Sequence, residues 1–470
     1  MEGFISAHRF LEDQDRCFDR RSGLKVRRSY SAILIAVLVL IAGTGNAQDI
    51  AGRWQGTLSV PKPLRVVLDI EKGSAGVLKG VAYSIDQSTS PASMSTLSFA
   101  GSTLKFTVDA YHASYEGTLS VDGKTITGNM TQGQTTSLNF ERATKETAWV
   151  IDPSPHKAQF ITVEKDIKLE VLDWGGTGRP LVLLTGLGND AHVFDKFAPK
   201  LTDKYHVYGI TRRGFGTSSQ PSPETASYAA DRLGEDVFAV IEALHLEKPV
   251  LAGHSVAGEE LSYIGTRHPE SVAGLIYLDA GYPYALYDEL NGALVIDAKE
   301  LREQLAMLAP GKMPPDQKAF TDELHTTLER VEKEVAAKQD ELRDMPPPPP
   351  PTGGAGPKPP PAGAAIVAGV MKFTTIKAPV LAIFADPHDP GNMFKDNPKA
   401  RAAFIASNNR STEQQAVAFE RQIPSAHVVR IPNANHYVFV SNEADVLREM
   451  NAFIAGLPVT PALGKDAASH

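Results

Sequence analysis

The sequence predicts an α/β protein: a mostly parallel, eight-stranded sheet with helices, preceded by a small all-β barrel or sandwich. Three observations predict it. Residues 48–145 alternate apolar and polar side chains with a period of two, the pattern of half-buried strands. Residues 146–460 carry apolar runs separated by helical patterns, which is typical of a parallel sheet covered by helices. Within them, Leu251–Gly258 reads as a strand, a tight turn around a serine and the start of a helix.

Residues 1–47 are predicted to be a signal peptide or an uncleaved N-terminal anchor. Basic side chains between residues 20 and 28 precede an apolar run at 32–42, and small residues follow it. This order is typical of secretory signals. The run is shorter than the roughly 20 residues that a membrane-spanning helix needs. We therefore expect an exported protein, periplasmic or secreted, that is held at a membrane only if the segment stays uncleaved.

Composition limits the partners. The chain has 470 residues and a formal net charge of −8, with no basic cluster after the N-terminal segment. Nucleic acid is therefore not an expected partner. The single cysteine, Cys17, lies inside the predicted signal, so we expect no disulfide in the exported protein.

The all-β domain, residues 48–145, is predicted to contain seven or eight short strands. Its clearest hairpin spans residues 117–128 and turns at Asp122-Gly123, a dipeptide that favours tight hairpin turns. The opening Gly52-Arg53-Trp54 resembles the Gly-x-Trp start of lipocalin-like barrels. That resemblance implies a site for a polymer or lipid; the alternative is a folding or spacing module.

The second domain, residues 146–460, is predicted to hold eight strands and a closing helix, with residues 461–470 as a tail. The expected strands are 159–163, 167–171, 180–184, 206–210, 249–251, 273–278, 378–384 and 426–431. The first two form a hairpin, and the last six are apolar runs of the kind found in buried parallel strands. An insertion at 281–376 contains a charged helix with an apolar stripe. A proline-rich tract at 346–363 follows, which favours an extended conformation.

The predicted nucleophile is Ser255. Small residues flank it at Gly253 and Ala257, as a sharp strand-to-helix turn requires, and this arrangement is the nucleophile elbow of serine hydrolases. The N–H groups of the following helix then point toward developing negative charge. His436, just after the eighth strand, is the expected general base, because a loop at that sheet edge can reach the serine.

These motifs resemble the α/β-hydrolase superfamily in its serine-nucleophile, esterase-like form, over about residues 150–460. The chain order serine, aspartate, histidine matches this superfamily and not chymotrypsin-like or subtilisin-like enzymes. The resemblance implies that the insertion at 281–376 forms a helical cap over the active site. Thr211–Ser218 is similar to the superfamily's Asp-x-Arg-Gly-x-Gly-x-Ser turn, with Thr211 in place of the acid; we interpret it as scaffold.

Three aspartates are candidates for the acid that orients His436 and stabilises its charged form. Asp389 and Asp386 lie in the turn after the seventh strand, and the resemblance favours Asp389 first and Asp386 second. Asp279, after the sixth strand, is third, because some members of the superfamily draw the acid from there.

The oxyanion hole is expected to use two backbone N–H groups. One belongs to Val256, immediately after the nucleophile. The loop at 184–189 is similar to the superfamily's His-Gly-x-Gly loop, with Thr185 in the histidine position. By that match, Leu187 supplies the second N–H.

The predicted activity is hydrolysis of small ester-like substrates through an acyl-enzyme. Epoxide hydrolases and haloalkane dehalogenases of this fold carry aspartate at the elbow, so Ser255 argues against both. Alternatives inside the fold are a lactonase or a proline iminopeptidase-like enzyme, although the typical Gly-Gly-Ser-Trp-Gly elbow of the latter differs from Gly253–Ala257. The alternative outside enzymes is a ligand-binding, receptor-like protein.

No cofactor is expected, and no metal. The other histidines, among them His192, are assigned to turns and surfaces, and His254 to packing below the elbow. No histidine pair has His-x-x-x-His spacing, the usual signature of a catalytic zinc site.

Overall fold

The computed structural model describes residues 49–60, 63–73, 76–86, 91–343, 361–391, 394 and 396–458. The predicted signal segment, residues 346–360 of the proline-rich tract and the predicted tail lie outside these residues. Among the residues described, no helix is both long and apolar enough to cross a membrane.

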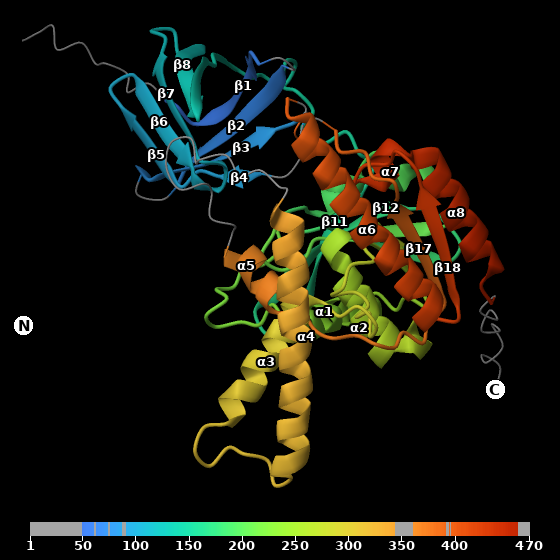
Figure 1. The fold of residues 1–470 in the computed structure, drawn as a ribbon. Coiled ribbons are helices and arrows are strands. Elements are labelled where there is room, and N and C mark those ends of the chain that lie inside the picture. The colour runs from blue at the N-terminus through green and yellow to red at the C-terminus, as the bar shows by residue number, and fades with distance from the viewer. Residues whose placement is uncertain are drawn as a thin grey trace, which may run out of the picture. The chain divides into compact units, whose positions relative to one another are not determined.

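The all-β domain is one ten-stranded antiparallel sheet in the order β4-β3-β2-β1-β10-β8-β7-β6-β5, with β9 paired to β8 (Figure 1). Its strands are β1 (Gly52–Leu58), β2 (Leu64–Lys72), β3 (Leu78–Ser84), β4 (Ala92–Ser93), β5 (Thr96–Ala100), β6 (Thr103–Val108), β7 (Ala113–Leu119), β8 (Thr125–Gln132), β9 (Gln134–Ser137) and β10 (Phe140–Arg142). A single-turn helix, η2 (Asp109–Tyr111), joins β6 to β7. The strand count exceeds the predicted seven or eight because β4, β9 and β10 are too short to show a period of two.

Apolar side chains from alternate strand positions form the core of this domain. Trp54, Phe106 and Phe140 are almost fully buried there, and the Trp54 indole N–H donates to the Ile50 carbonyl at 2.9 Å. The predicted hairpin is present, with Leu119 opposite Ile126.

The second domain is built on an eight-stranded sheet in the order β11-β12-β14-β13-β15-β16-β17-β18. Its strands are β11 (Lys157–Glu164), β12 (Ile167–Gly175), β13 (Pro180–Leu184), β14 (His206–Ile210), β15 (Val250–His254), β16 (Gly274–Leu278), β17 (Val380–Ala385) and β18 (Ala426–Ile431). The β11–β12 and β12–β14 pairs are antiparallel, and the remaining pairs are parallel. The predicted mostly parallel sheet is therefore confirmed.

Two apolar layers cover the faces of this sheet. The helices are η3 (Ala191–Phe194), η4 (Ala198–Lys200), α1 (Ala230–Ala243), η5 (Ser255–Ala257), α2 (Gly258–Arg267), η6 (Pro269–Ser271), α6 (Pro398–Gln422), α7 (Val438–Ser441) and α8 (Glu443–Gly456). Side chains of α1, α2 and α6 pack on one face, and those of η3, α7 and α8 pack on the other. Successive residues of β13 alternate between the two layers, which is why this strand reads as a continuous apolar run.

Within its described residues, the insertion contains three helices, α3 (Leu294–Met307), α4 (Gln317–Arg343) and α5 (Pro361–Ala368). The charged helix predicted within the insertion is α4. The proline-rich tract ends earlier than predicted, because residues 361–363 already belong to α5. Proline is tolerated in the first turn of a helix, where its missing N–H would have no partner. Ala362 and Ile366 of α5 pack in one apolar cluster with Val256 of the elbow, so part of the insertion covers the residue next to the predicted nucleophile.

Candidate active site

Ser255 sits at a strained turn between β15 and α2. Its φ is +55°, in the left-handed region that residues other than glycine rarely adopt. Tight packing around the turn holds this strained conformation in place. A Cβ on Gly258 would lie 2.2 Å from the Ala280 carbonyl oxygen, and one on Gly253 would lie 2.9 Å from Leu261. Position 258 therefore requires glycine, because a backbone oxygen occupies the space of a Cβ, whereas at Gly253 the obstacle is the end of the Leu261 side chain. The turn projects Ser255 from the end of β15.

A continuous hydrogen-bonded chain links Ser255, His436 and Asp279. His436 Nε2 lies 2.8 Å from Ser255 Oγ, and His436 Nδ1 lies 2.7 Å from Asp279 Oδ2. The other carboxylate oxygen of Asp279 accepts the Ala385 N–H at 3.0 Å. Asp279 is 5% exposed, so this carboxylate reaches the imidazole from the protein interior. The arrangement can take a proton from the serine and stabilise the imidazolium that results.

The structure corrects the choice of acid. The sequence favours Asp389, but its backbone N–H donates to Ala434 O at 2.8 Å and its carboxylate accepts the Gly391 N–H at 2.9 Å. Asp386, the second choice, faces Glu413, and burial together with that neighbour raises its pKa. It is Asp279, ranked third, that contacts His436. The turn at 386–390 instead pairs its backbone with residues 431–434 below the histidine loop.

His254 supports the histidine loop from below. Its Nε2 lies 2.9 Å from the His436 carbonyl oxygen, and the two rings are 4.6 Å apart. Burial, followed by the nearby His436, lowers the pKa of His254 to about 4. The ring is therefore neutral near pH 7, and its Nε2–H can donate to that carbonyl. Among the described residues its Nδ1 has no hydrogen-bond partner.

Two tyrosines of the insertion, which the sequence suggests as residues that line a cap, approach the site. Tyr284 lies near the Ser255 side chain, and burial raises the pKa of Tyr284 well above its usual value. Tyr282 stacks on Tyr284 at 5.3 Å, and its hydroxyl is 3.4 Å from His436 Nδ1. Both follow Asp279 by only a few residues, so the strand that positions the acid also positions them.

The loop after β13 packs directly against the nucleophile. A Cβ on Gly186 would lie 2.7 Å from His254 Nδ1 and 3.2 Å from Ser255 Cβ. The Asn189 side chain accepts a hydrogen bond from the Tyr437 hydroxyl at 3.2 Å, which joins the end of the loop to the residue after His436. The assignment of the Leu187 and Val256 N–H groups to an oxyanion hole stays a prediction. The loop that carries Leu187 lies beside Ser255, where such a donor is needed.

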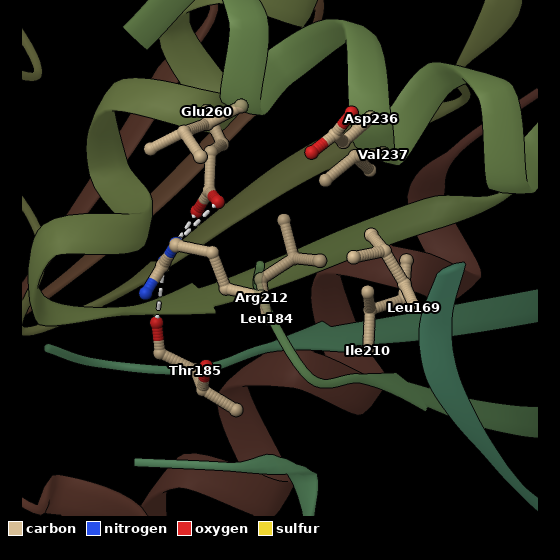
Figure 2. Close-up of a pocket in the computed structure, with 9 residues that line it drawn as sticks. Leu169, Leu184, Thr185, Ile210, Arg212, Asp236, Val237 and Glu260 are labelled. Carbon is tan, nitrogen blue, oxygen red and sulfur yellow. Dashed lines mark hydrogen bonds and ion pairs between the residues drawn. The ribbon is translucent and has the colours of Figure 1, made fainter. Parts of the chain in front are cut away.

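A buried ion pair behind this loop was not predicted (Figure 2). Arg212 donates to both oxygens of Glu260 at 2.7 and 2.6 Å and to the Thr185 carbonyl at 2.8 Å. Arg212 is 4% and Glu260 2% exposed. The pair joins α2, which starts at the elbow, to the first residue of the loop. The adjoining cavity is about 10 Å³, room for about one water molecule, so it is a packing cavity and not a substrate site.

The comparisons with known proteins match the fold described above. A family model described as "alpha/beta hydrolase fold" matches residues 179–443, more than half of the chain. Fluoroacetate dehalogenase of Burkholderia sp is 32% identical over 119 residues, which are 25% of this chain and 39% of that protein. Lipase 3 of Moraxella sp. (strain TA144) is 31% identical over 133 residues, 26% of this chain and 41% of that protein.

The chain therefore spans less than half the length of these two relatives. Among solved structures, the esterase RhEst1 from Rhodococcus sp. ECU1013 is 19% identical with a TM-score of 0.41, covering 65% of this chain and 100% of that chain. The family model covers six of the eight sheet strands, from β13 to β18, and includes the elbow, Asp279 and His436. On this match, the chain belongs to the α/β-hydrolase family.

Proposed function

We propose that the protein is an exported serine hydrolase that cleaves carboxylic esters or related acyl substrates through an acyl-enzyme. The single observation that carries the proposal is the hydrogen-bonded chain from Ser255 Oγ through His436 to Asp279, with distances of 2.8 and 2.7 Å. Export rests on the signal-like pattern of residues 1–47.

The first half of the reaction forms the acyl-enzyme. Ser255 Oγ attacks the ester carbonyl carbon while His436 Nε2 takes the serine proton. Asp279 stabilises the resulting imidazolium and fixes which ring nitrogen faces the serine. The carbonyl oxygen becomes an oxyanion, which the Val256 and Leu187 N–H groups would bind; one such donor is worth about 3–4 kcal/mol. His436 then gives its proton to the leaving alcohol as the carbon–oxygen bond breaks.

The second half regenerates the enzyme. Water attacks the acyl carbon while His436 accepts one of its protons, and the carboxylic acid leaves as Ser255 regains its hydrogen. Haloalkane dehalogenases of this fold use an aspartate at the elbow. Because this chain has Ser255 there, we expect its reaction to differ from dehalogenation.

Covalent labelling by a fluorophosphonate probe tests the activated serine. We expect the purified protein to label, and Ser255→Ala and His436→Ala to lose the label. A folded wild-type protein that neither labels nor turns over esters contradicts the proposal. Specific, saturable binding of a lipid or polymer by such a protein would support the receptor-like alternative.

A substrate panel then separates the alternatives within the fold. The panel contains esters of increasing acyl length, lactones and aminoacyl amides, each measured with the wild type and with Ser255→Ala. We expect turnover to depend on Ser255 and kcat/KM to be higher for esters than for lactones or aminoacyl amides. A higher kcat/KM on lactones or on aminoacyl amides would favour the lactonase or the aminopeptidase instead.

A further inference from the structure

Two histidines and two aspartates meet outside the candidate active site. This His–Asp cluster consists of Asp152, His156, His192 and Asp195. Asp152 and His156 come from the segment before β11, and the other two lie in and just after η3. Their side chains are between 7% and 23% exposed, so the cluster is largely withdrawn from solvent but reachable by a small ion.

The four side chains form a closed ring of contacts. Asp152 Oδ2 lies 3.1 Å from His156 Nε2 and 3.4 Å from His192 Nδ1. Asp195 lies 3.0 Å from His156 Nδ1 and 3.1 Å from His192 Nδ1. One ligand atom from each of the four residues can be chosen so that all lie within 4.8 Å of one another.

The spacing and chemistry fit a transition-metal ion. Zinc bonds to imidazole nitrogen and carboxylate oxygen of about 2.0–2.2 Å place tetrahedral ligands roughly 3.3–3.6 Å apart. The two His156 contacts use different ring nitrogens, only one of which can bind the ion. With one ligand atom from each residue, all four atoms lie within 4.8 Å of one another, so binding draws the four side chains closer together. Two imidazoles disfavour calcium and magnesium, which take oxygen ligands. The two carboxylates carry a charge of −2, which a divalent cation neutralises.

Groups around the cluster orient its ligands as the outer shell of a metal site does. His192 directs Nδ1 into the cluster, and its Nε2 lies 3.7 Å from Glu170 Oε1. Glu170 is itself fixed by the Thr211 hydroxyl at 2.7 Å. The His156 ring packs edge-on against Trp174, whose indole N–H donates to Ser154 at 2.8 Å.

We propose that the His–Asp cluster binds one zinc ion. The ion fastens the segment before β11 to η3, which directly follows the loop beside Ser255. Its role is structural, because the ligand set is closed by four protein side chains and such sites leave no open position for a substrate. The cluster lacks the His-x-x-x-His signature of zinc sites. Each of its two sequence segments instead pairs one histidine with one aspartate, as Asp152-x-x-x-His156 and His192-x-x-Asp195.

Metal binding is measured directly on the whole purified protein, free of any histidine tag and stripped with a chelator. Equilibrium dialysis with Zn²⁺ and elemental analysis should give one ion per chain. His156→Gln and His192→Gln should each weaken binding at least about 100-fold, and Glu170→Gln by about 10- to 100-fold. His206→Gln is the matched control, because His206 makes a comparable 2.9 Å contact with Asp173 outside the cluster; it should bind zinc as the wild type does.

Cobalt provides a readout that does not depend on how a variant folds. Co²⁺ in a tetrahedral site of the wild type should absorb strongly in the visible region, and added Zn²⁺ should remove that absorption. Thermal unfolding should shift upward with zinc in the wild type and not in His192→Gln. Failure of the wild type to bind zinc, or binding unaffected by both histidine variants, would overturn the proposal and leave an ion-pair network. Serine labelling is not part of this test, so its outcome is independent of the proposed esterase activity.

Discussion

Asp279 and His436 are 157 positions apart in the sequence, and their side chains meet at 2.7 Å. Each follows the end of a parallel strand: Asp279 follows β16, and His436 follows β18 by five residues. Strand β16 is the immediate neighbour of β15, so its end lies beside Ser255. Position in the sheet, and not the order along the chain, therefore selects the aspartate that reaches the histidine.

Replacing Asp279 by Asn should abolish most of the activity. An asparagine preserves the shape but stabilises neither the imidazolium nor the required ring tautomer, and the comparable change in serine proteases lowers kcat by about 10⁴. Asp389→Asn is the matched control and should change kcat less than about threefold. Steady-state kinetics on the best ester checks both, and a reversed order would restore Asp389 as the acid.

A methyl group on Gly258 should disrupt the elbow. Its Cβ would lie 2.2 Å from the Ala280 carbonyl oxygen, and this backbone atom belongs to the segment that also carries Asp279. We expect Gly258→Ala to lose serine labelling and to lower the unfolding temperature. Gly456→Ala, where nothing lies within 4 Å of the new Cβ, should label and melt like the wild type. Normal labelling of Gly258→Ala would show that the turn is not under this constraint.

Breaking the Arg212–Glu260 pair should be strongly destabilising. Removing one partner of a buried pair leaves an uncompensated charge, at a cost of about 3–5 kcal/mol in the free energy of unfolding. Arg212→Met should therefore destabilise the protein more than the double variant Arg212→Met/Glu260→Met, and urea unfolding of both measures the difference. The exposed Arg448 provides a control: Arg448→Ala should leave the unfolding midpoint unchanged. If Arg212→Met had no effect, the pair would not be holding α2 to the loop.

Glu259 should make stability depend on pH. Burial, then the neighbouring Glu260, raises the pKa of Glu259 to about 8, and among the described residues its carboxylate oxygens have no hydrogen-bond partner. Between pH 4.5 and 8 the folded chain therefore holds a proton that the unfolded chain has lost. Stability from this group is fully present below about pH 4.5 and falls as the pH rises toward 8.

Glu259→Gln removes that dependence. The difference between the free energies of unfolding of Glu259→Gln and of the wild type should grow in favour of the variant between about pH 5 and about pH 8. The growth should be on the order of a few kcal/mol. Urea unfolding at both pH values measures this change. A constant difference between the two proteins across that interval would mean that Glu259 is ionised in the folded state.

The sequence by itself determined the architecture and two residues of the candidate site. A run such as Leu181–Leu184 is apolar at every position because its side chains alternate between two buried layers, so periodicity identifies the parallel strands without a structure. The elbow is equally local: a sharp turn requires small residues at fixed distances from the serine. His436 follows from its place after the last strand.

Only the tertiary structure decided which aspartate contacts His436, the Arg212–Glu260 pair and the His–Asp cluster. Asp279, Asp386 and Asp389 all follow ends of neighbouring strands at one sheet edge, and sequence order cannot show which carboxylate faces the imidazole. Arg212 and Glu260 are 48 positions apart, and Asp152 reaches His192 across a comparable gap. Such contacts depend on how strands are ordered in the sheet and how loops cross its edge, and neither leaves a periodic signal along the chain.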